Sequence, residues 1–320
     1  MPDSPKVFSQ GKIKCDVQFS IDYITQKVYS FRMKISGILK RKRTLSFEVF
    51  PPKEDRSLRS LSATLKSLAE LAPDFISCTY GAGGTNVGRS LEVCKMVMDD
   101  GFDILTHFTC IGNTGENIDE QIKEYIKLGV ENVLLLRGDL PEGWSDTRSG
   151  FDHASNLISY FKEKHPNIGI AAAAYPEAHM ESPTVDDDIK YLKLKQDLGA
   201  EFFVTQLCHD VKAYDKFIKR IRGAGITIPV IIGLMPILTH DGTIRMSLTN
   251  GCSIPAELSR IMGSYNRDKE AFRKAGKEFT IDLIEQYLQS DIDGIHLYTL
   301  NKHEDIQEII DRSGLISKLN

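Results

Sequence analysis

The sequence predicts a (β/α)8 TIM barrel, in which eight parallel strands close into a ring and each strand is followed by a helix. Short β-prone segments alternate with longer amphipathic segments eight times after residue 43, which matches such a barrel in number and length. Polar residues follow almost every strand. The first strand is followed by FPPKEDRS, and not by the glycine-rich phosphate turn of a doubly wound open sheet, the main alternative.

The strand candidates are runs of β-branched, aromatic and aliphatic residues. In chain order they are TLSFEVF (44–50), DFISCTY (74–80), DILTHFT (103–109), NVLLLR (132–137), IGIAAAA (168–174), EFFVTQL (201–207), IPVIIGL (228–234) and GIHLYTL (294–300). Pro51 and Pro52 end the first strand, because a proline has no N–H to donate to a neighbouring strand.

The segments between the strands carry apolar residues at helical spacing. Residues 57–72 and 117–129 are examples, and the second ends at Gly129, a residue type that commonly ends helices. The connection after the seventh strand is longer and contains two candidate helices, at residues 254–262 and 267–289. GAGGTN at residues 81–86 lacks the last glycine of G-x-G-x-x-G, so it is a poor dinucleotide fingerprint.

The start of the chain is basic, with ten Lys and Arg against three Asp in residues 1–43. From Met33 onward, MKISGILKRKRTLSFEVFPP reads as a complete start, with a short amphipathic basic helix before the first strand. We therefore divide the chain into a basic N-terminal extension, residues 1–40, and a catalytic barrel, residues 41–320. We hypothesise that residues 1–32 are an upstream extension or a loosely attached tail.

Composition excludes several classes of function. The formal net charge of −4 gives no overall footprint for nucleic acid. Six cysteines show no metal-ligand spacing, and several lie in apolar runs, which favours reduced, buried thiols. The sequence shows no apolar segment of membrane-spanning length and no signal peptide. We expect a cytoplasmic protein without metal, nucleic-acid or membrane partners.

The polar residues at the strand ends predict an active site, because barrel enzymes carry theirs at the C-terminal ends of the strands. These residues are Glu48, Thr79, Tyr80, His107, Thr109, Arg137, Gly138, Asp139, Tyr175, Glu177, His179, Gln206, Tyr298, Asn301 and Lys302. Each has an ordinary structural explanation alone, since Asp139, for example, could cap a turn. Together they indicate an active site.

The residues alone do not choose the reaction. No Ser-His-Asp order, HExxH, phosphate loop or Cys-His cluster is present. The four alanines at residues 171–174 either leave room for a ring system or fill a tapering barrel. The pattern therefore supports an enzyme with one or two acid–base carboxylates and a bulky ligand.

Seven segments in register resemble methylenetetrahydrofolate reductase of the bacterial type, across about residues 34–315. They are FEVFPPK, CTYGAGG, HFTC, LLLRGDLP, AAYPEAH, TQ and LYTLN. The resemblance implies a barrel that binds FAD without a dinucleotide fold. It also implies reduction of 5,10-methylenetetrahydrofolate to 5-methyltetrahydrofolate, with NAD(P)H and the folate reacting in turn at FAD in a ping-pong sequence. Methionine biosynthesis and acetyl-pathway carbon flow would use the same site, so the direction and the pathway stay open.

The resemblance also implies roles for individual residues. Glu48 matches the general acid that protonates the folate bridge nitrogen, and Asp139 matches a catalytic aspartate near flavin and pterin. Substrate positions are Glu48, Asp139, Gln206, Tyr298 and Lys302, although the family commonly has Arg at the last. Cofactor positions are Thr79, His107, Arg137, Gly138, Asp139, Ala173, Tyr175, His179, Asp188 and Lys195. No metal site is implied.

Several expectations accompany this assignment. Phe47, Val49 and Phe50 should wall Glu48, partly desolvate it and favour its protonated form. His240 stands where many relatives carry an aromatic residue. We expect a homo-oligomer, and a companion electron-transfer subunit stays open, as does the choice between NADH and NADPH. The alternative function is a flavin-free, folate-binding barrel for one-carbon or methyl transfer.

Overall fold

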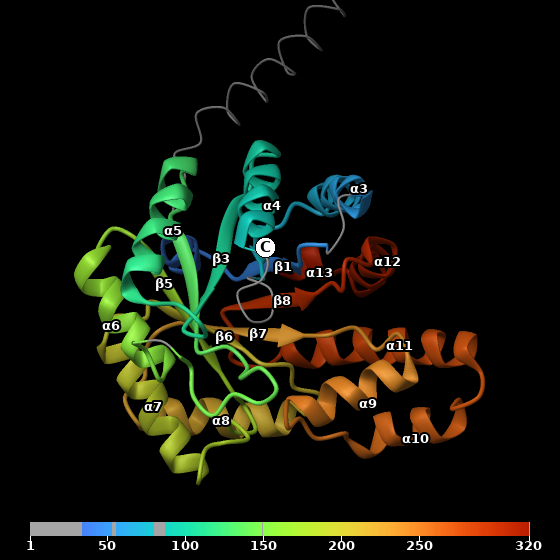
Figure 1. The fold of residues 1–320 in the computed structure, drawn as a ribbon. Coiled ribbons are helices and arrows are strands. Elements are labelled where there is room, and N and C mark those ends of the chain that lie inside the picture. Colours follow the sequence, from blue (N-terminus) through green and yellow to red (C-terminus); the bar gives the residue numbers. More distant parts are fainter. Residues whose placement is uncertain (1–33, 53–55, 80–86, 149, 320) are drawn as a thin grey trace, which may run out of the picture. The chain divides into compact units, whose positions relative to one another are not determined.

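The computed structural model describes residues 34–52, 56–79, 87–148 and 150–319 (Figure 1). Its strands form one closed barrel in which β1 to β8 follow each other in chain order. The predicted (β/α)8 barrel is therefore confirmed. The predictions for residues 1–33, for Tyr80 and for GAGGTN at residues 81–86 lie outside the described residues.

Every predicted strand is present, with ends that differ by at most a few residues. The strands are β1 (Thr44–Val49), β2 (Phe75–Cys78), β3 (Asp103–Thr109), β4 (Asn132–Leu136), β5 (Gly169–Ala174), β6 (Phe202–Thr205), β7 (Val230–Leu234) and β8 (Gly294–Tyr298). All neighbours pair in parallel, and β8 closes the ring on β1. Phe47 thus pairs with Ile76 of β2 on one side and with Leu297 of β8 on the other.

The helices lie outside the barrel, apart from α2 (Ile35–Leu39) at its base. They are α3 (Arg56–Glu70), α4 (Val87–Asp99), α5 (Gly115–Leu128), α6 (Ala154–Lys164), α7 (Val185–Asp197), α8 (Val211–Gly223), α9 (His240–Thr249), α10 (Ala256–Ser264), α11 (Lys269–Tyr287), α12 (His303–Ser313) and α13 (Leu315–Leu319). As predicted, α5 ends at Gly129, whose φ of 94° suits glycine. The two helices predicted after the seventh strand correspond to α10 and α11.

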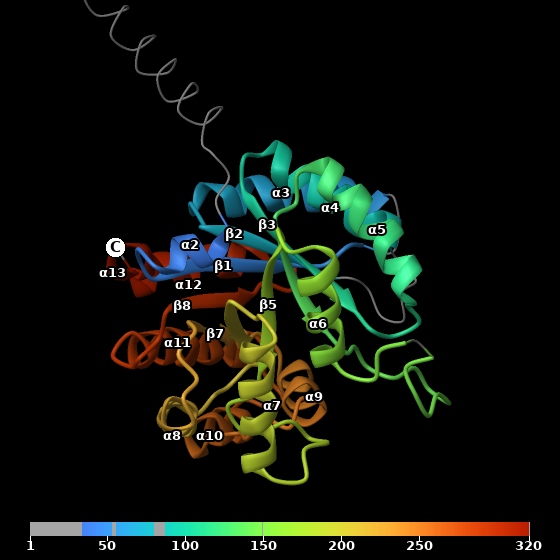
Figure 2. The same ribbon diagram turned by 90° about the vertical axis from the view of Figure 1, so that its left-hand side faces the viewer.

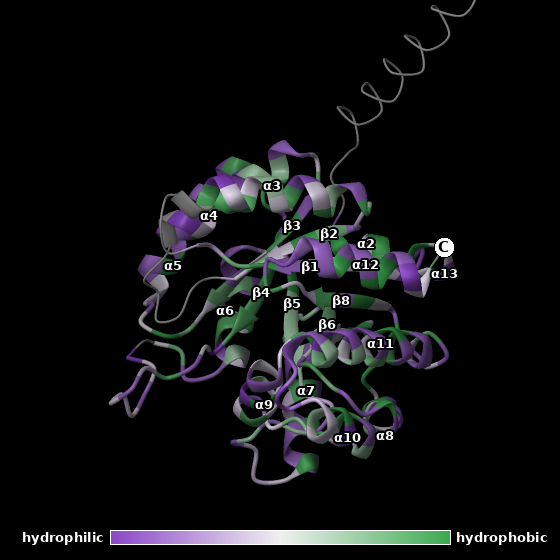
Figure 3. Ribbon diagram, turned by 90° about the vertical axis from the view of Figure 1, so that its right-hand side faces the viewer, coloured by the Kyte–Doolittle hydropathy of each residue, from purple (hydrophilic) through white to green (hydrophobic). Residues whose placement is uncertain are grey.

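The helices are amphipathic, and α11 shows hydrophobic and hydrophilic residues mixed along its length (Figure 3). The last helix, α13, lies beside β1, so the C-terminal part of the chain packs against its first strand (Figures 1 and 2). No helix in the described part of the chain is both long and apolar enough to cross a bilayer. The described cysteines, Cys78, Cys94, Cys110, Cys208 and Cys252, are buried and unpaired, as predicted.

The barrel wall separates two apolar cores. The outer core lies between strands and helices and contains Phe47 and Val49. The inner core contains Phe75, Leu105 and Phe202. Because successive strand residues point to opposite faces, Phe47 and Val49 face the helices, whereas Glu48 faces the barrel interior near His107. Phe50 is 42% exposed. The predicted apolar wall around Glu48 is therefore wrong.

Helix α2 closes the base of the inner core. Ile35 is fully buried and packs with Leu39 and Phe75 in the inner core. The Ile35 N–H donates to Oδ1 of Asn132, 3.0 Å away at the start of β4. The short helix expected after Met33 is thus present and belongs to the barrel core. The division of the chain at residue 40 stays a prediction.

Replacing Ile35 by alanine should destabilise the barrel. Ile35→Ala should lower the free energy of unfolding by about 2–5 kcal/mol, because it leaves a cavity in the inner core. Ile126→Ala is the control, because Ile126 is 44% exposed and should change stability by less than about 0.5 kcal/mol. Urea denaturation of both variants measures the difference. Equal stabilities of the Ile35→Ala and Ile126→Ala variants would contradict the role of α2 in closing the inner core.

Candidate active site

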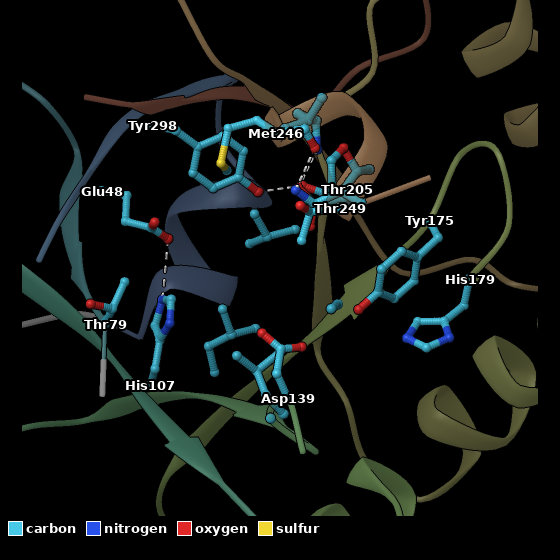
Figure 4. Close-up of a pocket in the computed structure, with 18 of the residues that line it drawn as sticks. Glu48, Thr79, His107, Asp139, Tyr175, His179, Thr205, Met246, Thr249 and Tyr298 are labelled. Carbon is cyan, nitrogen blue, oxygen red and sulfur yellow. Dashed lines mark hydrogen bonds and ion pairs between the residues drawn. The ribbon is translucent and has the colours of Figure 1, made fainter. Parts of the chain in front are cut away.

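A cavity of about 590 Å³ opens at the C-terminal ends of the strands. Most residues predicted for the site line it, namely Glu48, Thr79, His107, Arg137, Gly138, Asp139, Ala173, Tyr175, His179, Gln206 and Tyr298. Figure 4 shows Glu48, Thr79 and His107 on one side of this cavity and Tyr175 and His179 on the other. The strand ends therefore converge on one space, as the sequence predicted.

A second cavity of about 320 Å³ adjoins the first. The two cavities share Arg137, Ala173, Tyr175 and His179 in their linings. The second cavity adds the two remaining predicted cofactor positions, Asp188 and Lys195. The predicted cofactor residues therefore follow one elongated site that spans both cavities.

Several residues singled out from the sequence lie elsewhere. Thr109, Glu177 and Asn301 line neither cavity. Lys302 is exposed at the start of α12 and lines neither cavity. His240 also lines neither cavity, and its ring packs edge-on against Phe272 at 5.6 Å. Met235 and Met246 line the larger cavity instead. Apolar contact with a ligand in this region would therefore come from methionines.

Glu48 faces two imidazoles inside the barrel. Its Oε2 atom lies 3.6 Å from Nε2 of His107 and 3.8 Å from Nε2 of His296. His296 in turn is held by two serines, with Ser46 Oγ 2.8 Å from Nδ1 and Ser77 Oγ 3.3 Å from Nε2. His296 was not predicted from the sequence. It precedes Tyr298 by two residues on β8, so strand alternation could have placed it on the same inner face.

His107 is a neutral side chain at neutral pH. Burial lowers its pKa from 6.5 to about 4; the carboxylate of Glu48 raises this pKa and His296 lowers it further. Its Nε2 atom is buried and has no hydrogen-bond partner among the described residues. A buried polar atom of this kind normally has a partner, so His107 is suited to contact a polar atom of a ligand in the cavity.

Gln206 presents an amide of fixed orientation. Its Oε1 accepts from the N–H of Leu207 at 2.8 Å, and its Nε2 donates to Oδ1 of Asn250 at 2.7 Å. Asn250 donates in turn to the carbonyl of Met246 at 2.8 Å. Because a carboxamide carries two N–H donors, one N–H of Gln206 stays available to the cavity. Asn250 follows α9 and is distant from the strand ends in sequence, and no sequence motif indicated it.

Tyr298 offers its ring to the cavity while its hydroxyl is occupied. The hydroxyl donates to the carbonyl of Thr205 at 2.7 Å. Burial raises the pKa of Tyr298 well above its usual value, and the charge of Glu48 raises it further. A Cβ atom on Gly233 would stand only 2.3 Å from the Thr205 carbonyl oxygen and 2.7 Å from the Tyr298 hydroxyl. Glycine at residue 233 therefore makes room for this contact.

Charged groups gather where the two cavities meet. Arg137 forms a two-point pair with Glu181, including an NH2-to-Oε1 bond of 2.8 Å, and this pair lowers the pKa of Glu181. Burial lowers the pKa of Lys195 to about 8, against the opposing effect of Asp188, and its Nζ donates to the Ala173 carbonyl at 2.9 Å. Arginine and lysine of this kind suit phosphate oxygens.

Comparison with known proteins assigns the chain to a family. The model of the methylenetetrahydrofolate reductase family matches residues 33–314. The chain belongs to the methylenetetrahydrofolate reductase family. This confirms the resemblance recognised from the sequence segments.

Relatives in this family differ in length. Methylenetetrahydrofolate reductase 1 of Schizosaccharomyces pombe is 34% identical over 297 residues, which cover 89% of this chain and 49% of that protein. The 5,10-methylenetetrahydrofolate reductase of Escherichia coli is 31% identical over 261 residues, which cover 81% of this chain and 87% of that protein. This methylenetetrahydrofolate reductase family member thus spans about half the length of the yeast relative.

A solved structure has a similar fold. It is an uncharacterized protein from Clostridium thermocellum that binds two copies of 5-methyl-5,6,7,8-tetrahydrofolic acid. The TM-score is 0.63 at 16% identity, and the match covers 88% of this chain and all of that chain. At this identity the likeness supports the fold of the methylenetetrahydrofolate reductase family member and carries no argument about its ligand.

The buried His107 should make stability depend on pH. The pKa of His107 is about 4 in the folded protein, against an ordinary value of 6.5. The contribution of the neutral side chain to the free energy of unfolding is therefore complete above pH 6.5 and is lost as the pH falls toward 4. Between pH 7 and pH 5 the wild-type protein should lose about 2 kcal/mol more unfolding free energy than His107→Asn.

Urea denaturation at several pH values measures this difference. His209, whose pKa burial also lowers to about 4, is present in both proteins and cancels in the comparison. Parallel pH profiles for wild type and His107→Asn would contradict the assignment of a neutral, buried His107.

Proposed function

We propose that this chain reduces 5,10-methylenetetrahydrofolate to 5-methyltetrahydrofolate with NAD(P)H, through bound FAD. The observation that carries the proposal is the position of Glu48, a carboxyl group in the wall of the larger cavity, which Asp139 and Gln206 also line. Family membership supports the same reaction. We also propose that the chain assembles as a homo-oligomer, while a companion subunit stays an open prediction.

The residues of both cavities fit FAD. His107 offers a buried nitrogen that has no partner among the described residues, and Ala173, in both linings, leaves space beside the main chain. Arg137, His179 and Lys195 would hold the diphosphate or ribose oxygens, and Thr79, His107 and Tyr175 would hold the ring system. When bound, the flavin would supply a hydride acceptor and donor between NAD(P)H and the folate.

Glu48 would act as the general acid. Its proton would pass to the bridge nitrogen N10 of the folate, the bond between N10 and the methylene carbon would break, and the electron pair would stay on N10. The methylene carbon, now part of an iminium, would accept the hydride. No Lys or Arg among the described residues forms an ion pair with Glu48, whose nearest titratable partners are His107 and His296.

Asp139 and Gln206 would serve the two substrates in different ways. The negative charge of Asp139 would disfavour an anionic reduced ring beside it and so favour hydride donation. Gln206, held by Asn250, would offer its remaining N–H either to the pterin or to the nicotinamide. Because both groups are planar and need this same donor, they would occupy the larger cavity in turn, which is the basis of the proposed ping-pong sequence.

An anaerobic titration tests the proposal. Purified protein incubated with FAD should stay yellow after desalting, and NADH or NADPH should bleach it. Methylenetetrahydrofolate should then restore the colour, with formation of 5-methyltetrahydrofolate. A protein that binds the folate but never retains FAD would overturn the proposal in favour of the flavin-free alternative.

The substitution Glu48→Gln separates the two half-reactions. Folate reduction should fall by about 10²–10⁴-fold, the usual contribution of a general acid, while flavin reduction by NAD(P)H should be unchanged because it needs no proton from Glu48. Stopped-flow absorbance measures each step. Glu120→Gln, at an exposed position on α5, is the control and should leave both steps intact. Equal losses in both half-reactions would refute the role of Glu48.

A further inference from the structure

The segment Thr299–Leu300–Asn301, directly after β8, holds the end of β1, which carries Glu48. Thr299 donates twice to the main-chain carbonyl of Glu48, from its N–H at 3.3 Å and from its hydroxyl at 2.6 Å. The first bond continues the parallel pairing of β8 with β1, whose last register pair joins Glu48 to Tyr298. The hydroxyl adds a second donor to the same carbonyl.

The side chain of Asn301 extends this pairing by one more residue. Its Oδ1 accepts from the N–H of Phe50 at 3.3 Å, and its Nδ2 donates to the Phe50 carbonyl at 3.1 Å. A carboxamide has the same donor and acceptor as a peptide group. The Asn301 side chain therefore makes the two hydrogen bonds to Phe50 that a further main-chain residue of β8 would otherwise make. Pro51 and Pro52, which follow directly, have no N–H with which to continue a ladder.

The strained main chain of this segment orients the side chains of Leu300 and Asn301. Leu300 and Asn301 have φ values of 51° and 55°, in the left-handed region that asparagine tolerates and leucine rarely adopts. Thr299 stabilises the turn, because its hydroxyl accepts from the Asn301 N–H at 3.1 Å and its carbonyl accepts from the Lys302 N–H at 2.8 Å. The turn directs Asn301 to β1, while Leu300 lines the larger cavity.

The carboxyl group of Glu48 depends on this main-chain support. Its nearest partners among the described residues are the two imidazole nitrogens, at 3.6 and 3.8 Å, and both distances exceed those of a hydrogen bond. On the other edge of β1, the N–H of Thr79 donates to the Val49 carbonyl at 3.2 Å. The direction of the Glu48 side chain is therefore set by the fixed main chain of residues 48–50.

We propose that Asn301 is a positioning residue that acts on the general acid through the main chain of β1, together with Thr299. The inference rests on the proposed role of Glu48. Loss of the Asn301 amide frees both main-chain groups of Phe50 and lets the end of β1 shift. Proton donation to the folate depends on that position, whereas hydride transfer from NAD(P)H to flavin does not.

Two substitutions test this inference. Asn301→Gly removes the amide but keeps a residue that adopts a φ of 55° without strain. It should slow folate reduction by about 10²-fold, the effect of roughly 1 Å of misplacement, with flavin reduction by NAD(P)H unchanged. Asn301→Asp keeps the acceptor for the Phe50 N–H but lacks the donor to its carbonyl, so an intermediate loss is expected. Asn117→Ala, at an exposed position on α5, is the matched control.

Hydrogen exchange gives a readout that needs neither cofactor nor substrate. In the ligand-free protein, a peptide covering residues 45–52 should gain one rapidly exchanging amide, that of Phe50, in Asn301→Gly and not in Asn301→Asp. Suppose that the wild type reduces the folate. The inference is then overturned if Asn301→Gly reduces the folate equally fast, and also if Asn301→Gly slows both half-reactions to the same extent. If wild type itself does not reduce the folate, the proposed function fails, and unchanged exchange at Phe50 would separately refute the contact.

Discussion

Closure of the strand ring is the constraint on which the rest of this protein depends. Each strand pairs on both edges, and the pairing of β8 with β1 leaves no edge open. Closure forces alternate residues of all eight strands into one narrow interior. That interior is apolar at the base, around Ile35 and Phe75, and polar toward the strand ends, around His296 and Glu48. The polar layer is possible because its groups partner one another across strands that are distant in sequence.

This arrangement gives the site its rigidity. Ser46, Ser77 and His296 come from three strands and form one hydrogen-bonded group beneath Glu48. The hydroxyl of Tyr298 reaches across two strand positions to the carbonyl of Thr205. A side chain whose polar atoms are already bonded to another strand has few alternative rotamers. The part of the cavity wall formed by Tyr298 and Thr205 is therefore defined before any ligand arrives, which is what electrostatic preorganisation of a site requires.

Much of this could be predicted from the sequence, because strand composition, turn residues and polar strand ends are local signals. The bounds of β3 agree with the prediction at both ends. The apolar wall predicted around Glu48 was wrong because neighbours in sequence lie on opposite faces of a strand, and the imidazoles that Glu48 does face come from β3 and β8. Asn250 was missed because a loop residue contacts Gln206 only through the tertiary fold. Lys302 lies near a strand end in sequence, yet the left-handed turn at Leu300 and Asn301 precedes it, and it lies at the start of α12.

The ion pair between Arg137 and Glu181 has a further consequence for anion entry. The side chain of Arg137 is 22% exposed, whereas that of Glu181 is 60% exposed. An anion that binds the Arg137 guanidinium would displace the Glu181 carboxylate. Because that carboxylate is already largely hydrated, the exchange carries little desolvation penalty. Glu181 is thus a readily displaced counter-ion of Arg137, and binding of an anion would free the Glu181 side chain to move outward into solvent.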